Sequence, residues 1–157
     1  MVIRLARPED TEDIVSLHRL LADYHRRIDD YYKEGKDTAD NFRLFLQDMF
    51  ARKDARVIVA EDRGKLAGYF IGIIRASKPY VRHARTGRIS DAFIRENYRH
   101  QGLGNMMFEH LKNWFKEHGI QHIELSVDVR NAAGIKAWRK YGFRDFMLKM
   151  RLDMEEE

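Results

Sequence analysis

The sequence contains no cysteine among its 157 residues. This absence excludes disulfide bonds, a cysteine nucleophile and thiolate metal ligands. The seven histidines are scattered, and no two of them share a helix face at ligand spacing, so we expect no metal cofactor. No apolar run approaches the roughly 20 residues that cross a bilayer. The opening stretch MVIRLARPED also lacks the apolar core of a signal peptide. We therefore expect a cytoplasmic protein with no membrane partner.

Composition and charge are those of an ordinary globular protein. Hydrophobic residues make up 44% and charged residues 34% of the chain, and its length suits one domain over residues 1–157. The net charge is +4 and the sequence pI is near 9.3. A basic excess of this size could serve nucleic acid or a phosphorylated cofactor, but it is also typical of an ordinary charged surface.

The periodicity of apolar residues predicts the element order β-α-α-β-β-β-α-β-α-β. Alternation or short apolar runs predict strands at 2–7, 56–60, 66–74, 89–94, 122–129 and 143–152. Helical spacing predicts helices at about 8–28, 38–52, 103–118 and 132–141. This order indicates an α/β protein in which helices flank a central mixed β-sheet.

The stretch at 87–115 contains the strongest functional signal. A short strand ending at Ile94 leads into Arg99-His100-Gln101-Gly102-Leu103-Gly104, where a helix with apolar residues four apart begins. Glycines at a helix start let the backbone approach a ligand closely. The first-turn N–H groups lack partners within the helix, and the helix dipole is positive there. The sequence therefore predicts an anion cradle suited to a pyrophosphate.

This Arg-x-x-Gly-x-Gly pattern resembles the acyl-CoA-binding signature of the GNAT acetyltransferase superfamily. A second element, Asn131 to Phe143, reads NAAGIKAWRKYGF and is similar to the family's Asn-led helix that ends in Gly-Phe. The resemblance implies a single GNAT domain that transfers an acetyl group from acetyl-CoA to a primary amine. The cofactor-binding residues that it implies are Ala92, Phe93, Ile94, Arg99, His100, Gln101, Gly102, Leu103, Gly104, Asn105 and Asn131.

Two residues are candidates for the proton transfers of amide formation. Asp91 lies in the strand that the resemblance assigns to the cofactor, and a carboxylate there could deprotonate an ammonium directly or through water. A structural carboxylate bonded to the backbone is the alternative. The family's acid is a tyrosine at the position that Trp138 occupies here. Tyr141, one helical turn further on, could replace it or could simply pack in the core.

The acceptor site is expected at the segment between the first two helices, because the resemblance places the acceptor there. Asp29, Asp30, Tyr31 and Tyr32 could bind a cationic amine, or the segment could be a solvated loop with two anchoring tyrosines.

Two other classes of function stay open. Trp138 and Ser126, which stands where some protein N-terminal acetyltransferases carry a glutamate, would suit a non-catalytic acyl-CoA sensor. The acid-free basic stretch at 75–88 would suit an RNA-associated module, although no aromatic recognition motif accompanies it, and we expect no nucleic-acid partner. A homodimer is possible, since small members of the family often pair.

Overall fold

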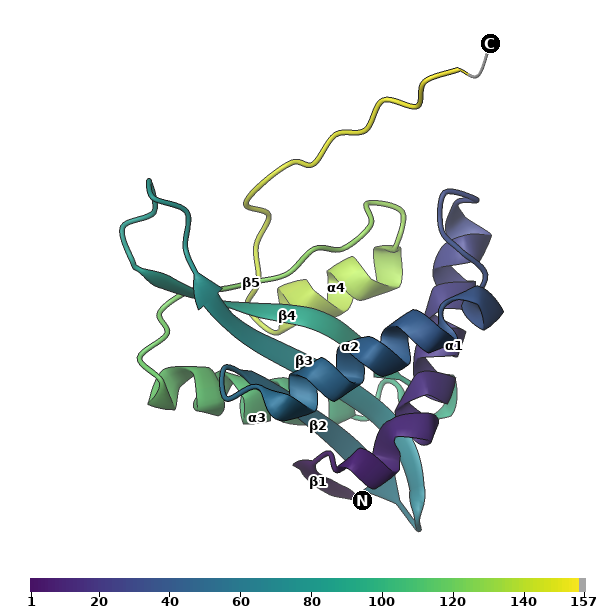
Figure 1. Cartoon of the computed structure of the whole chain (residues 1–157). Coiled ribbons are helices and arrows are strands. Elements are labelled where there is room, and N and C mark those ends of the chain that lie inside the picture. The colour runs from purple at the N-terminus through teal and green to yellow at the C-terminus, as the bar shows by residue number, and fades with distance from the viewer. Residues whose placement is uncertain (156–157) are drawn as a thin grey trace. The chain divides into compact units, whose positions relative to one another are not determined.

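The computed structural model describes residues 1–155, which divide into two compact units with the boundary after Ser126. In chain order the first unit contains β1 (Val2–Leu5), α1 (Thr11–Ile28), α2 (Ala39–Ala51), β2 (Ala55–Asp62), β3 (Lys65–Ala76), β4 (Arg85–Ile94), α3 (Leu103–Glu117) and β5 (Ile123–Glu124) (Figure 1). The second unit contains α4 (Ala132–Lys140). The predicted order of elements is confirmed as far as α4.

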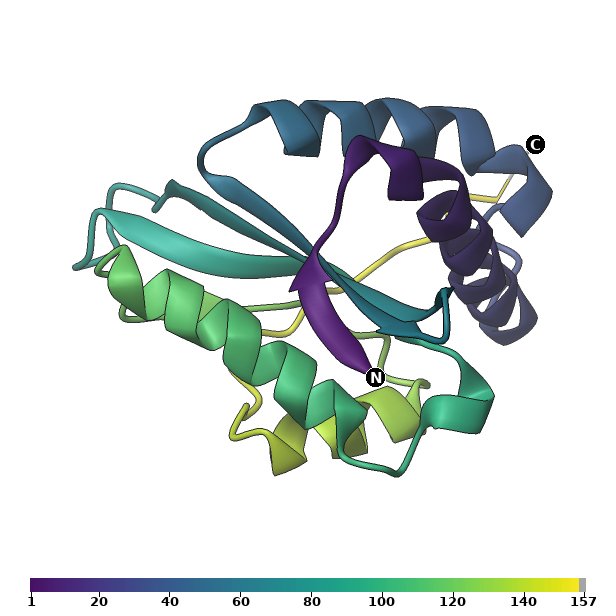
Figure 2. The ribbon, with the colours of Figure 1, turned by 90° about the horizontal axis from the view of Figure 1, so that it is seen from below.

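The five strands form one mixed sheet in the order β1-β2-β3-β4-β5. Neighbouring strands from β1 to β4 are antiparallel, and β5 alone runs parallel to its neighbour, β4. Figure 2 shows α1 and α2 on one side of this sheet and α3, which connects β4 to β5, on the other. Of the helices in residues 1–155, none combines the length and the apolar character that crossing a membrane requires.

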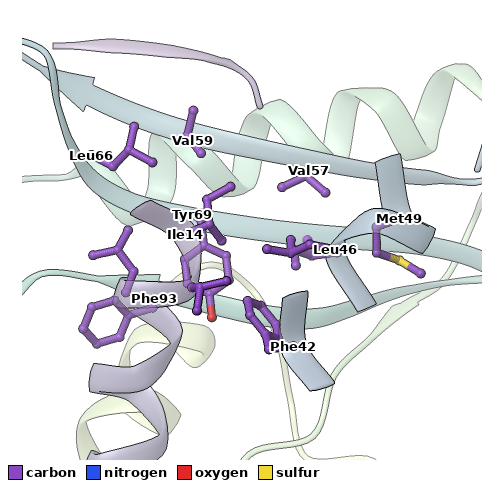
Figure 3. Packing of buried hydrophobic residues seen from close by; sticks show 12 residues of the cluster. Ile14, Phe42, Leu46, Met49, Val57, Val59, Leu66, Tyr69 and Phe93 are labelled. Atoms are coloured by element: carbon purple, nitrogen blue, oxygen red, sulfur yellow. The ribbon is translucent and has the colours of Figure 1, made fainter. Parts of the chain in front are cut away.

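The core under α1 and α2 comes from the alternation of residues along the strands. Residues of β2, β3 and β4 that point to one face, including Val57, Val59, Tyr69, Ile71 and Phe93, pack against apolar side chains from both helices (Figure 3). Tyr69 is fully buried in this cluster. The cluster therefore fixes the position of β4 relative to α1 and α2.

The other face of the sheet is packed against α3. Met107, Leu111 and Phe115, which fall four apart as the sequence predicts, are fully buried. Gly72 of β3 lets the helix approach closely, because a Cβ there would lie 3.0 Å from Phe115 and 3.3 Å from Leu111. This packing holds α3 against the sheet.

Two predicted strands differ from the structure. The strand expected at 122–129 is reduced to Ile123–Glu124, and the last strand expected at 143–152 is wrong: residues 143–155 are outside any helix or strand. A strand needs a hydrogen-bonded neighbour, and β5 pairs with β4 at only two positions. The apolar side chains of the expected last strand are instead exposed, among them Phe146, Leu148, Met150 and Leu152. Apolar residues do alternate in this segment, but such alternation forms a strand only where a neighbouring strand is available for pairing.

In the second unit, Asn131 caps α4 as predicted. Its side-chain oxygen accepts a hydrogen bond of 2.9 Å from the backbone N–H of Gly134. At the other end, Gly142 takes a positive φ of 102°, which ends the helix.

Candidate active site

One edge of β4 is open where the predicted cofactor strand lies. Residues Asp91–Ile94 pair with β3 on one side, but pairing with β5 is confined to Gly87 and Arg88. Among the described residues, the backbone of Asp91–Ile94 therefore has no strand neighbour on its second side. An extended ligand that carries amide groups could hydrogen-bond along this edge as an added strand does. The side chain of Phe93 is buried in the core, so this residue offers only its backbone.

A β-bulge lies immediately before the open edge. Ile71 of β3 is opposite Asp91, and the next residue, Gly72, is opposite Ile89, so Ser90 is the extra residue. The hydroxyl of Ser90 is buried without a hydrogen-bond partner. A bulge bends its strand and changes the direction of the side chains next to it. It places Asp91 on the same face of the sheet as Tyr69 and α1.

The loop before α3 has the backbone geometry of an anion cradle. His100 and Gly102 both adopt the left-handed region, with φ of 61° and 81°. Gly102 provides no side-chain cap, and the first hydrogen bond of the helix runs from Met106 N–H to the Gly102 carbonyl. The N–H groups of Leu103, Gly104 and Asn105 precede that bond, so they are available to an anion.

Arg99 and Gln101 are held in this loop by hydrogen bonds to the backbone. Arg99 Nε donates to the Ile94 carbonyl at 2.8 Å, and its guanidinium lies 5.4 Å from the centre of the Phe93 ring. Gln101 Nε2 donates to the Asn97 carbonyl at 3.1 Å. The first unit thus brings the open edge of β4 and the predicted loop at residues 99–105 together, with Arg99 joining the two.

Asp91 opens onto a cavity of about 270 Å³ under α1 and α2. The cavity is lined by His18, Lys33, Thr38, Asn41, Phe42, Phe45 and Asp91. Tyr69 donates a hydrogen bond of 3.3 Å from its hydroxyl to Asp91 Oδ1. Burial, together with the negative charge of Asp91, raises the pKa of Tyr69 well above its usual value, so the phenol stays a donor. A largely buried carboxylate at the wall of such a hollow can attract an ammonium group.

Sequence patterns did not identify His18 and Tyr69 as site residues. His18 Nδ1 lies 3.1 Å from the Tyr69 hydroxyl and 3.5 Å from Asp91 Oδ1. One signal could have identified His18: it falls on the apolar face of its helix, four residues after Ile14 and three before Leu21. Tyr69 carried no comparable signal, because a tyrosine among apolar strand residues is usually only core.

Of the predicted acceptor residues, Asp30, Tyr31 and Tyr32 line a second cavity, of about 430 Å³, whereas Asp29 is outside its lining. Tyr31 and Tyr32 line it together with side chains of both charges: Arg26, Asp30, Lys33, Glu34, Lys36 and Asp37. Asp29 ends α1, and its carboxylate accepts a hydrogen bond of 3.0 Å from the Tyr31 N–H. Lys33 is shared with the cavity at Asp91, so the two cavities are neighbours. Among residues 1–155, His, Asp and Glu side chains form no cluster of three that could hold a metal ion.

Asn131 and Tyr141 belong to the second unit. Tyr141 follows the last residue of α4, and its ring meets Trp138 edge to face at 5.6 Å. Trp138 meets Phe143 in the same way at 5.4 Å. Burial raises the pKa of Tyr141, which keeps its hydroxyl protonated. Its place in this aromatic cluster accords with the packing role, and the raised pKa is also compatible with a proton donor.

Known proteins share both the sequence pattern and the fold. The model of the acetyltransferase (GNAT) family matches residues 15–143. An uncharacterized N-acetyltransferase of Methanocaldococcus jannaschii is 24% identical over 143 residues, which are 91% of this chain and 60% of that protein. The chain thus spans less than two thirds of that relative.

Two solved structures show the same fold. A tetramutant protein from Bacillus halodurans has a TM-score of 0.86 at 24% identity, over 98% of this chain and 100% of that one. A predicted acetyltransferase from Clostridium acetobutylicum, solved with acetyl-CoA, has a TM-score of 0.77 at 21% identity, over 97% and 95% of the two chains. With the family model matching most of its length, this chain belongs to the acetyltransferase (GNAT) family.

Proposed function

We propose that the protein transfers an acetyl group from acetyl-CoA to a primary amine of a small molecule or protein. One observation carries the proposal: Asp91, at the cavity under α1 and α2, directly precedes the open-edged residues Ala92–Ile94. An amine held at Asp91 and a thioester held along the β4 edge would be neighbours on one strand. Placing two reactants in this way lowers the barrier, because their translational freedom is already lost.

The cofactor is proposed to lie along β4, with its pyrophosphate at the start of α3. The N–H groups of Leu103, Gly104 and Asn105, the positive end of the helix dipole and Arg99 all favour negative charge there. The remaining loop residues, His100, Gln101 and Gly102, shape the cradle. Family membership and the neighbour solved with acetyl-CoA support this assignment. Asn131 is proposed to add a contact to the pantetheine arm.

In the reaction, the amine nitrogen attacks the thioester carbonyl, and the carbon–sulfur bond then breaks. N–H groups on the open edge of β4 can donate to the oxyanion that forms. Asp91 is proposed to draw in the ammonium and to promote the loss of its proton. Tyr141 is proposed as a donor to the departing thiolate. Tyr31 and Tyr32 would bind a part of the acceptor that extends into the larger cavity, and Asp29, whose carboxylate accepts from the Tyr31 N–H, would add a negative charge beside them.

Thiol release from acetyl-CoA in the presence of different amines tests this proposal. The panel would contain a polyamine, an amino acid ester, an aminoglycoside and a lysine peptide, each measured with and without protein. Amine-dependent thiol release with formation of the acetylated amine is the expected result. Acetyl-CoA binding by calorimetry without release for any amine would instead favour the non-catalytic sensor. Salt-sensitive RNA binding without acetyl-CoA binding would favour the RNA-associated module.

A further inference from the structure

The ring of His18 is held in place on two sides within the cavity at Asp91. It stacks on the ring of Phe42, with the centroids 3.6 Å apart and the planes 6° from parallel. Its Nδ1 atom lies 3.1 Å from the Tyr69 hydroxyl and 3.5 Å from Asp91 Oδ1. The side chains of His18 and Asp91 are only 18% and 20% exposed. Both side chains are thus largely buried, and their exposed parts line the cavity.

The hydrogen bonds of this cluster favour one tautomer of the His18 ring. The Asp91 carboxylate can only accept, and the Tyr69 hydroxyl donates to it. With the hydroxyl proton directed to Asp91, the matching arrangement has His18 Nδ1 donating to the Tyr69 hydroxyl oxygen. In the neutral imidazole, the lone pair then lies on Nε2. No hydrogen bond is formed by Nε2 with any described residue.

We propose that His18 Nε2 accepts the proton of the acceptor ammonium, with Asp91 and Tyr69 positioning the ring. This role rests on the proposed function. In the step, the ammonium gives one proton to Nε2, leaving a neutral amine and an imidazolium. The amine lone pair then forms the bond to the acetyl carbon, and the carbon–sulfur bond breaks. The thiolate takes a proton from the donor proposed above, Tyr141, and the second proton of the nitrogen restores that donor. The imidazolium releases its proton to water.

The charges around His18 favour this transfer. Asp91 on β4 faces it at 3.5 Å and stabilises the imidazolium, while Tyr69 on β3 is neutral. The residues of α2 and its N-cap at the cavity, Thr38, Asn41, Phe42 and Phe45, carry no charge. Lys33, on the connection after α1, is the one cation in the lining. It is exposed, so water screens its charge.

The variant His18→Asn tests the role, because an asparagine amide can still donate toward Tyr69 and Asp91 but has no atom in place of Nε2. His110→Asn, at an exposed position of α3, is the matched control. With an amine that the wild type accepts, kcat/KM of His18→Asn should fall about 10²–10⁴-fold at neutral pH. The part of the pH–rate profile that depends on the imidazole should be absent from the variant. Acetyl-CoA affinity should stay within about twofold of wild type.

Two further measurements separate a catalytic role from a structural one. His18→Phe keeps the stack on Phe42 and should be as inactive as His18→Asn while remaining folded. Nitrogen-15 spectra of the imidazole in the wild-type protein should show the proton of neutral His18 on Nδ1. A proton on Nε2, or a His18→Asn variant with unchanged kcat/KM and pH profile, would overturn the proposal. If the wild type released no thiol with any amine, the proposed function would be contradicted as well. If the wild type were active and His18→Asn had the same kcat/KM, only the role of His18 would be contradicted.

Discussion

The hydroxyl of Tyr69 and the carboxylate of Asp91 lie 3.3 Å apart, on neighbouring strands beneath α1. The hydrogen bond joins the buried core of the sheet to the cavity proposed to receive the amine. Because Tyr69 is fully buried and faces a negative charge, the cost of ionising its phenol is high. A core residue therefore fixes the orientation of the carboxylate on which the proposed chemistry depends.

The first prediction follows from this buried phenol. The pKa of Tyr69 is raised above its unfolded value by burial and by Asp91, so its contribution to stability is complete below the unfolded tyrosine pKa of about 10. That contribution should be lost as pH rises from there through the folded pKa. We expect Tyr69→Phe to flatten the alkaline fall in stability, measured by denaturant unfolding from pH 8 to 11. An identical alkaline fall in wild type and variant would contradict the raised pKa.

A matched pair of glycines tests the anion cradle. Gly102 and Gly119 have φ of 81° and 72°, and a Cβ added at either would meet nothing within 4 Å. Substitution by alanine should therefore introduce a similar backbone strain, of about 1 kcal/mol, at each position. Only Gly102→Ala should weaken acetyl-CoA binding, by about tenfold or 1.4 kcal/mol, because its methyl group would stand at the proposed pyrophosphate. Calorimetry that found equal affinities for the two variants would place the cofactor elsewhere.

Asn131 has a capping role that can be separated from its proposed cofactor contact. Asn131→Ala removes the acceptor for the Gly134 N–H and should destabilise the protein by about 1 kcal/mol. Asn131→Asp keeps an oxygen acceptor at the same position and should retain most of that stability. If Asn131 also contacts the pantetheine arm, both variants should bind acetyl-CoA more weakly. Normal affinity in Asn131→Asp would leave only the cap.

Tyr141→Phe tests the proposed acid. The change removes one hydroxyl and keeps the ring that packs on Trp138, so the fold should be retained. A dedicated general acid contributes about 10²–10⁴-fold, and the loss should appear in kcat with unchanged acetyl-CoA affinity. A loss of less than about tenfold would assign Tyr141 to packing. A faster Trp138→Tyr variant would then indicate that the wild-type protein works without this acid.

The sequence predicted the elements whose signal is local. The four-residue spacing of Met107, Leu111 and Phe115 predicts α3, and the glycines before it predict the cradle. The prediction of a strand at 143–152 was wrong, because the alternation of apolar residues gives no information about a neighbouring strand to pair with. The end of β5 was misplaced for the same reason, since pairing with β4 stops after two residues.

The cluster at Asp91 shows that prediction of the site from sequence has the same limit. Asp91 was a candidate from its strand, but its partners His18 and Tyr69 lie 73 and 22 positions before it in the sequence. Only the packing of α1 on the sheet brings them together. No spacing rule connects residues on three different elements, so geometry was needed to identify the cluster.

The most direct test is thiol release from acetyl-CoA by wild type and Asp91→Asn, measured with one accepted amine from pH 6 to 10. At neutral pH the amine is almost entirely protonated, so the variant should be slower by about 10²–10⁴-fold. The difference should narrow toward pH 10, as free amine becomes abundant and help with deprotonation matters less. Circular dichroism and acetyl-CoA calorimetry control for fold and cofactor binding. Parallel pH–rate profiles separated by less than about threefold would contradict the assignment of the amine site to Asp91.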